Sequence, residues 1–194
     1  MTFALTRLRA MDRDFRALWA TLSGSNDATL SPARRWGAFA GLFGLGSDEI
    51  FVISVGDVAH VNEHLLALEP VLEASTLLLE PTVRPTSDAP LTREGLYVFR
   101  FFEVANQDVD EVAALSREAW ETFETTGDYV AEPQALFCQA DRSPERGRML
   151  LVTWYDGFDS WQNSRNPDPA ARENFRRRHA LTTGTIAYAT RLLT

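Results

Sequence analysis

A single arginine lies in the middle of the apolar stretch LYVFRFFEV, which covers residues 96–104. Arg100 has a phenylalanine on each side, and burying a charge without a partner is costly. One interpretation is functional, because a guanidinium that faces a cavity binds a carboxylate or a phenolate through two parallel hydrogen bonds. The other interpretation is structural: Arg100 pairs with an acid such as Glu103 or Glu132, or extends its charged end to solvent. Arg7 lies in the corresponding stretch of the first half, and both interpretations apply to it as well.

A second group of cations lies in the segment RENFRRRH, residues 172–179. At helical spacing Arg172, Arg176 and His179 share one face. They would bind an anion or hold the propionates of a haem, with His179 as a candidate axial ligand. The alternative is a solvated face whose cations lie near the C-terminus of the helix, where the helix dipole favours them.

The remaining reactive residue types form no recognisable site. His60 and His64 have the spacing of two metal ligands on one helical turn, but no third ligand follows a known pattern, so a surface pair is the alternative. Cys138 is the only cysteine, which excludes an internal disulfide and favours a buried structural thiol. The sequence has no G-x-S-x-G motif and no lysine, which excludes a lysine Schiff base. We therefore expect no metal.

Two further aromatic residues stand where a predicted strand meets a predicted helix, in LLVTWYD at 150–156. Trp154 either packs under a helix or lines a cavity, depending on which face of the strand it occupies. Asp156 is expected to accept hydrogen bonds from the first amides of the following helix, and Asp57 is expected to do the same in the first half.

The two halves of the chain resemble each other in order. ALWATL (17–22) resembles EAWETF (118–123), and FVISVGD (51–57) resembles LLVTWYD (150–156). Two more weak pairs of segments keep the same order, at offsets near one hundred residues. Each pair is weak by itself, but the shared order, with offsets that drift with loop length, indicates an internal duplication.

Each half has the same predicted series: a strand, a helix, two strands, a second helix and a last strand. In the first half the strands are expected at 3–9, 34–45, 49–57 and 76–83, and the helices at 12–23 and 61–72. In the second half the strands are expected at 96–103, 134–140, 148–155 and 184–193, and the helices at 107–126, 158–163 and 168–180.

The order β-α-β-β-α-β is that of a ferredoxin-like unit, whose antiparallel sheet has helices on one face. The other face must also be buried, and strands such as YVFRFF and MLLVTWY are apolar on both faces. We therefore predict an α+β protein of two tandem ferredoxin-like units, residues 1–84 and 96–194, joined by a linker at 85–95. Their sheets are expected to meet as an intrachain dimeric α/β-barrel.

Composition excludes several classes of partner. The net charge is −8 and is divided equally between the halves, so there is no basic domain for nucleic acid. No apolar run is long enough to cross a bilayer, and the N-terminus does not resemble a secretory signal. We expect a cytoplasmic protein with no nucleic-acid or membrane partner. A monomer and a homodimer both remain open.

Arg100 within LYVFRFFEV, the strand end Tyr155-Asp156 and the segment SRNPDPAARENFRRRH together resemble the NIPSNAP family, which belongs to the dimeric α/β-barrel superfamily. The resemblance covers about residues 95–194 and implies the fold and a barrel cavity. The same superfamily includes antibiotic-biosynthesis-type monooxygenases and chlorite-dismutase-like haem proteins.

Three functions follow as hypotheses. The preferred one is a NIPSNAP-like protein that binds a small apolar or aromatic molecule in the barrel, without a cofactor, through Trp36, Arg100, Trp154 and Tyr188. The second is a monooxygenase, either independent of cofactors or haem-dependent, that uses Arg100, Tyr188 and His179 in a dry pocket. The third is a non-catalytic interaction module whose outer helices contact a partner.

Overall fold

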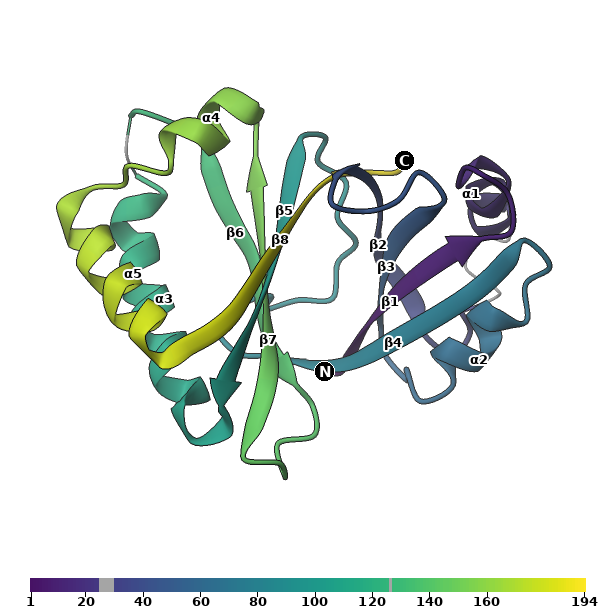
Figure 1. The fold of residues 1–194 in the computed structure, drawn as a ribbon, viewed down its shortest axis with the longest axis horizontal. Coiled ribbons are helices and arrows are strands. Elements are labelled where there is room, and N and C mark those ends of the chain that lie inside the picture. Colours follow the sequence, from purple (N-terminus) through teal and green to yellow (C-terminus); the bar gives the residue numbers. More distant parts are fainter. Residues whose placement is uncertain (25–29, 126) are drawn as a thin grey trace. The chain divides into compact units, whose positions relative to one another are not determined.

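The structure is a computed structural model that describes residues 1–24, 30–125 and 127–194. The chain forms two compact units, and each unit includes a short segment from the other half of the sequence (Figure 1). The first unit comprises residues 1–80, 87–93 and 190–194, and the second comprises residues 81–86 and 94–189.

The first unit is a four-stranded antiparallel sheet in the order β4-β1-β3-β2, with two helices. Its elements are β1 (Phe3–Ala10), α1 (Arg16–Gly24), β2 (Arg34–Phe43), β3 (Glu49–Val55), α2 (Val61–Leu66) and β4 (Val71–Pro81).

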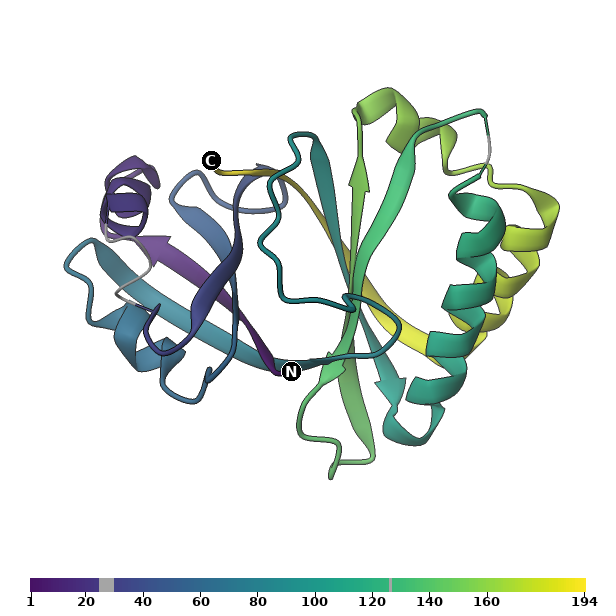
Figure 2. The same cartoon turned by 180° about the vertical axis from the view of Figure 1, so that it is seen from behind.

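The second unit repeats this plan in the order β8-β5-β7-β6 but has a third helix. Figure 2 shows α3 and α5 side by side on one face of this sheet. Its elements are β5 (Leu96–Ala105), η2 (Asn106–Asp108), α3 (Val109–Phe123), β6 (Ala131–Gln139), β7 (Arg146–Tyr155), α4 (Phe158–Asn163), α5 (Pro169–Leu181) and β8 (Thr182–Leu192).

The exchanged segments are held by backbone hydrogen bonds. The amide of Thr82 donates to the carbonyl of Leu136 at 2.9 Å in the second unit. In the first unit the amide of Leu193 donates to the carbonyl of Ala38 at 2.8 Å. The amide of Leu91 donates to the carbonyl of Trp36, also at 2.8 Å.

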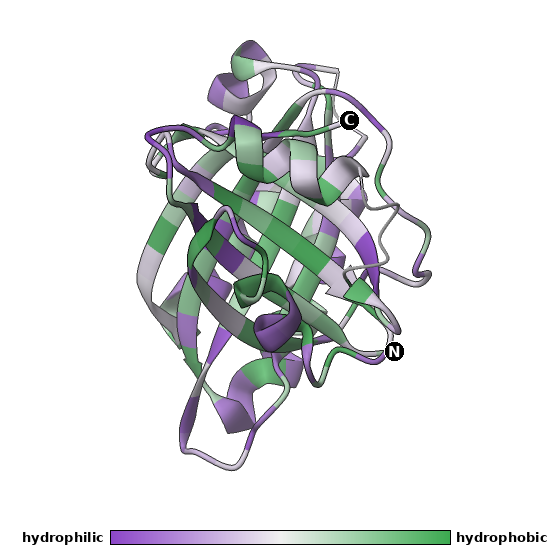
Figure 3. Ribbon diagram, turned by 90° about the vertical axis from the view of Figure 1, so that its right-hand side faces the viewer, coloured by the Kyte–Doolittle hydropathy of each residue, from purple (hydrophilic) through white to green (hydrophobic). Residues whose placement is uncertain are grey.

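Helix α3 shows why the sequence pattern is a reliable guide here. Its residues Val112, Ser116, Trp120 and Phe123 repeat at intervals of three or four and are buried, as their spacing predicts. In Figure 3 both the strands and the helices carry hydrophobic and hydrophilic residues. None of the helices formed by the described residues is both long and apolar enough to cross a membrane.

The predicted fold class, α+β with tandem ferredoxin-like units, is confirmed. The predicted helix at 61–72 is too long: α2 ends at Leu66, and Val71 already begins β4. Proline lacks an amide hydrogen, so Pro70 separates a helix from a strand instead of kinking one helix. The predicted helix at 107–126 begins as a short 3-10 turn, and its last residue lies outside the described part of the chain.

The predicted role of Asp156 is wrong. Gly157 is the N-cap residue of α4, no side chain accepts a hydrogen bond there, and Asp156 is exposed. The prediction for Asp57 is closer to the structure, because Asp57 Oδ1 accepts a hydrogen bond from the amide of Ala59 at 3.4 Å. That bond closes a turn before α2, whose N-cap residue is His60.

Candidate ligand-binding site

A cavity of about 410 Å³ lies within the second unit. That volume is in the usual range for small-molecule sites, about 300–1,000 Å³. Two neighbouring strands form its floor, because alternate residues of a strand point to the same face. Arg100 on β5 is registered opposite Leu151 on β7, and both line the cavity. The other floor residues of these strands are Val98, Phe102, Thr153 and Tyr155.

Two helices form the roof. Helix α3 contributes Trp120 and Phe123, which are three residues apart. Helix α5 contributes a face with the spacing i, i+3, i+4, i+7. The residues of α5 that line the cavity are Arg172, Phe175, Arg176, Arg178 and His179. The segment between α4 and α5 adds Ser164, Arg165 and Pro167.

The walls combine aromatic side chains with an excess of positive charge. Five arginines line the cavity, whereas none of its described lining residues is an aspartate or a glutamate. This contrasts with the net charge of −8 for the whole chain. The chain therefore concentrates cations around one internal space.

Arg178 is the most deeply buried of these cations, with 9% of its surface exposed. Its guanidinium carbon lies 4.9 Å from the ring centre of Phe175 and 5.9 Å from that of Phe102. Its Nη1 donates to Ser116 Oγ at 3.3 Å, while the Ser116 hydroxyl donates to the carbonyl of Val112. Burial, and then the positive charge of Arg100, lowers the pKa of Arg178 to about 10, so it is still charged at neutral pH.

Arg100 shares this environment. Burial lowers its pKa, the charge of Arg165 lowers it further, and Tyr155 opposes the shift. Glu103 and Glu132, the partners considered from the sequence, are not among the groups that shift the pKa of Arg100. No acid among the described residues forms an ion pair with Arg100 or Arg178.

The phenol oxygen of Tyr155 is a polar group near both of these arginines. Burial raises the pKa of Tyr155, against the opposing effects of its hydrogen bond to Ser164 and of the nearby arginines. The phenol is therefore neutral. Ser164 Oγ also donates to the carbonyl of Trp161 at 2.8 Å.

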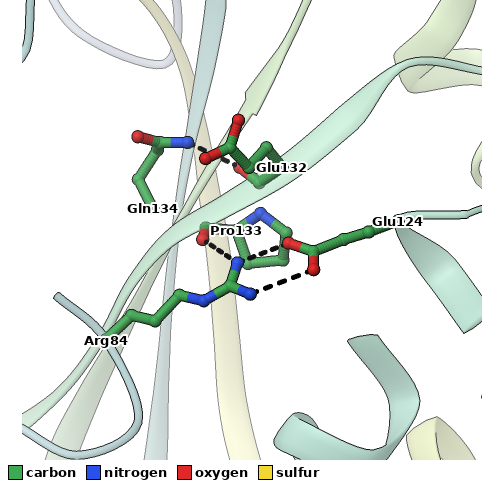
Figure 4. A network of polar contacts seen from close by, with 5 residues as sticks. All are labelled: Arg84, Glu124, Glu132, Pro133 and Gln134. Atoms are coloured by element: carbon green, nitrogen blue, oxygen red, sulfur yellow. Dashed lines mark hydrogen bonds and ion pairs between the residues drawn. The ribbon is translucent and has the colours of Figure 1, made fainter. Parts of the chain in front are cut away.

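An ion pair supports the wall on the side of Trp120 and Pro133 (Figure 4). Arg84 binds both carboxylate oxygens of Glu124, and its Nη1 donates to the carbonyl of Pro133 at 2.8 Å. Its guanidinium carbon also lies 5.1 Å from the ring centre of Trp120. The hydrogen bond to Glu124 raises the pKa of Arg84 above its ordinary value, although burial opposes that shift. Arg84 therefore positions two cavity residues without lining the cavity itself.

The four residues predicted to line a ligand site have different surroundings within their own units. Arg100 lines the cavity of the second unit. Trp154 lies between Thr153 and Tyr155 on β7 and therefore faces the other side of the sheet, where its Nε1 donates to the carbonyl of Glu94 at 2.8 Å. Tyr188 contacts Phe101, with ring centres 5.8 Å apart, and Phe101 is also on the side opposite Arg100. Trp36 belongs to the first unit, where its ring packs against Phe3 at 5.8 Å.

The three histidines lie in two different places. His179 lies in the cavity wall but is exposed. Histidines that bind metals usually donate their second nitrogen to an acceptor, and no described residue accepts such a bond from His179. The cavity residues therefore do not fit a haem bound through His179. His60 and His64 are exposed on and beside α2, and the Nδ1 atom of His60 bonds to Glu63 at 2.7 Å. The described residues contain no group of three or more potential metal ligands.

Sequence reasoning placed Arg172, Arg176 and His179 on one face but did not single out Arg178. A signal was present, because Arg178 follows Ala171 and Phe175 at i+7 and i+3. Both of those residues pack in the core cluster of the second unit. An arginine on the inward stripe of a helix indicates a buried charge, and therefore a site.

No protein-family model matches the chain, and no curated protein matches it in sequence. Solved structures do match it over its full length. A chlorite dismutase mutant from Candidatus Nitrospira defluvii has a TM-score of 0.64 and 8% identity, covering 100% of this chain and 91% of that one. An anthrone oxidase-like protein has a TM-score of 0.61 and 13% identity, with coverages of 100% and 92%.

A ferredoxin-fold protein from Listeria monocytogenes 4b F2365, related to antibiotic biosynthesis monooxygenases, has a TM-score of 0.56 and 11% identity. It is covered to 95%, and this chain to 100%. At these identities the likeness shows the fold alone, which is the ferredoxin-like fold of dimeric α/β-barrel proteins. The resemblance to the NIPSNAP family stays a prediction.

Proposed function

We propose that the protein binds a small apolar or aromatic molecule, and that it does so in the cavity of the second unit. The observation that carries this proposal is a space of about 410 Å³ between sheet and helices, lined by Phe102, Trp120, Phe123 and Phe175. Aromatic walls favour flat or apolar ligands, and a few polar groups set the orientation. Of the four residues that the sequence predicted to line a ligand site, this proposal includes only Arg100.

The test uses N-phenylnaphthylamine, an uncharged apolar dye that fluoresces when it leaves water. We expect saturable binding to the wild-type protein. Thr153→Trp should abolish it, because the larger side chain fills the cavity from its floor. Arg148→Trp is the matched control, since it adds the same side chain to an exposed position of the same strand. Circular dichroism verifies that both variants fold. Equal binding by both variants would place the site elsewhere.

A second candidate function is oxidation of the bound molecule by oxygen without a cofactor. Two similar structures are described by oxygen chemistry, as an anthrone oxidase-like protein and a relative of antibiotic biosynthesis monooxygenases. The specific observation in this chain is the pair of cavity guanidiniums, buried Arg178 and half-buried Arg100, which would stabilise an ionised phenol in a site with little water. Oxygen uptake in the presence of anthrone, compared between wild type and Thr153→Trp, distinguishes catalysis from binding alone.

A further inference from the structure

Two arginines of the cavity, half-buried Arg100 and buried Arg178, differ from two other arginines of the chain. Arg84 has Glu124 as a partner, and Arg7 binds both carboxylate oxygens of Glu49. Arg100 and Arg178 are buried further than Arg7, yet neither has a carboxylate among the described residues. Arg84 and Arg7 therefore have a counter-charge, whereas the two cavity arginines have none among the described residues.

The contacts that Arg178 does make cannot replace a counter-charge. Two aromatic rings and one serine hydroxyl contact it. A cation–π contact stabilises a buried ion by much less than its burial costs. The second guanidinium, that of Arg100, adds repulsion. The protein alone therefore leaves this pair of charges poorly compensated.

The oxygens around the pair are neutral. Tyr155 is a neutral phenol, and the hydroxyl of Ser116 donates to the carbonyl of Val112. The two guanidiniums together offer more hydrogen-bond donors than these oxygens accept, because each carries five N–H groups. What is missing is an acceptor with a negative charge.

We propose that the ligand of this cavity is an organic acid whose anionic group binds between Arg100 and Arg178 and whose apolar body packs on Phe102, Trp120 and Phe175. This inference rests on the proposed binding function and specifies its ligand class. A carboxylate, a sulfonate or a phenolate meets the requirement, since each presents a negative oxygen to the guanidinium groups. Arg165 and Arg172, exposed on the cavity wall, add a field that attracts anions.

The experiment compares two dyes of nearly the same shape, anilinonaphthalene sulfonate, which is an anion, and N-phenylnaphthylamine, which is neutral. We expect the wild-type protein to bind the anion about tenfold or more tightly than the neutral dye, the worth of a charged hydrogen bond. Arg100→Met and Arg178→Met should each remove most of that preference, because each weakens binding of the anion far more than binding of the neutral dye. Arg148→Met, an exposed arginine on β7, should leave both affinities unchanged.

The outcomes separate the two proposals. Equal affinity of the wild-type protein for both dyes would overturn the acid inference and leave the cavity as a site for neutral molecules. A preference for the anion that survives both substitutions would also overturn it, because other residues would then bind the anionic group. Failure of both dyes to bind would contradict the proposed binding function itself.

Discussion

The two units have the same strand order, yet only in the second does an arginine of the first strand line the cavity described above. The register of the strands identifies the matching position. Arg100 is opposite Leu151, and Thr6 is opposite Val52, while the internal repeat aligns Val52 with Leu151. Thr6 therefore corresponds to Arg100, although the sequence alone suggested Arg7. The Thr6 hydroxyl is bonded to that of Thr76 at 2.8 Å, and the Thr76 hydroxyl donates to Asn62.

The helices explain the difference. In the first unit β4 begins soon after the short α2, and the buried side chains form one apolar cluster. In the second unit α5 is inserted between α4 and β8, and it supplies much of the cavity roof. The additional helix α5 therefore accounts for much of the cavity in the second unit.

The largest expected effect comes from placing the second unit's residue in the first. Thr6→Arg would bury a charge in a packed core and break the hydrogen bonds to Thr76. We expect a loss of about 4 kcal/mol or more in the free energy of unfolding, or failure to fold. Urea denaturation measures it. The reciprocal variant, Arg100→Thr, should not lose stability, because it removes a buried charge. Similar losses in both variants would show that the units do not differ in this way.

The next largest expected effect is a gain in the free energy of unfolding. Arg178→Met removes the most buried charge of the cavity and keeps a side chain of similar length. We expect the free energy of unfolding to rise by about 1–2 kcal/mol in the absence of ligand, since apolar replacements of buried ions are neutral or stabilising. Arg148→Met, on an exposed position, should cause no change. A marked loss of stability in Arg178→Met would indicate a structural role instead of a ligand-binding one.

The exchanged segments offer a matched pair of ion pairs. Arg84–Glu124 in the second unit has side chains 34% and 23% exposed, whereas Arg34–Asp88 in the first unit has side chains 54% and 46% exposed. Glu124→Gln should lower the free energy of unfolding by about 1 kcal/mol, and Asp88→Asn by less than about 0.5 kcal/mol, because solvent screens exposed pairs. Thermal unfolding of the two variants compares them. A larger loss of stability in Asp88→Asn than in Glu124→Gln would contradict the conclusion that Arg84 and Glu124 support the cavity wall.

Each unit also contains a buried hydroxyl that has no partner among the described residues, Ser54 in the first and Tyr129 in the second. Ser54→Ala and Tyr129→Phe should each raise the free energy of unfolding by about 1 kcal/mol. Burial raises the pKa of Tyr129 to about 12 from an ordinary value of 10.0, so the unfolded chain ionises first. The contribution of Tyr129 is therefore complete below pH 10.0 and is lost as the pH rises toward 12.

That pH dependence separates the two hydroxyl variants. Between these pH values the wild-type protein should lose stability relative to Tyr129→Phe, whereas Ser54→Ala should follow the wild type. Urea denaturation at a series of alkaline pH values tests it. A Tyr129→Phe variant that follows the wild type would show that Tyr129 titrates normally.

The smallest effect concerns Arg7 and Glu49, a pair that the second unit lacks at its matching site. Burial alone would raise the pKa of Glu49, but hydrogen bonds from Arg7 and from the amide of Gly46 bring it below 4.5. The pair therefore contributes stability above about pH 4.5, which disappears as the pH falls through the lower pKa of the folded state. Glu49→Gln should lower the free energy of unfolding by about 0.5 kcal/mol at neutral pH. The difference from wild type should vanish in acid; a constant difference would contradict it.

How far the sequence leads can be judged at particular residues. The stripe Val112, Ser116, Trp120 and Phe123 indicated the buried face of α3 correctly, because helical periodicity is a local property. The face of Trp154 was undecided, because a strand alternates with period two and either face can be buried. Arg178 was missed because its importance depends on Phe102, Ser116 and Arg100, which come from three other places in the chain.

The sequence by itself determined the order of elements, the duplication and the apolar character of both sheets, since periodicity and composition act over short distances. Only the tertiary structure decided where the charges lie. It brought Arg100 from β5 and Arg178 from α5 into one cavity without a carboxylate, and it paired Arg7 with Glu49 and Arg84 with Glu124. Whether an arginine has a negatively charged partner depends on residues tens of positions away in the sequence. No local sequence pattern predicts which residues those are.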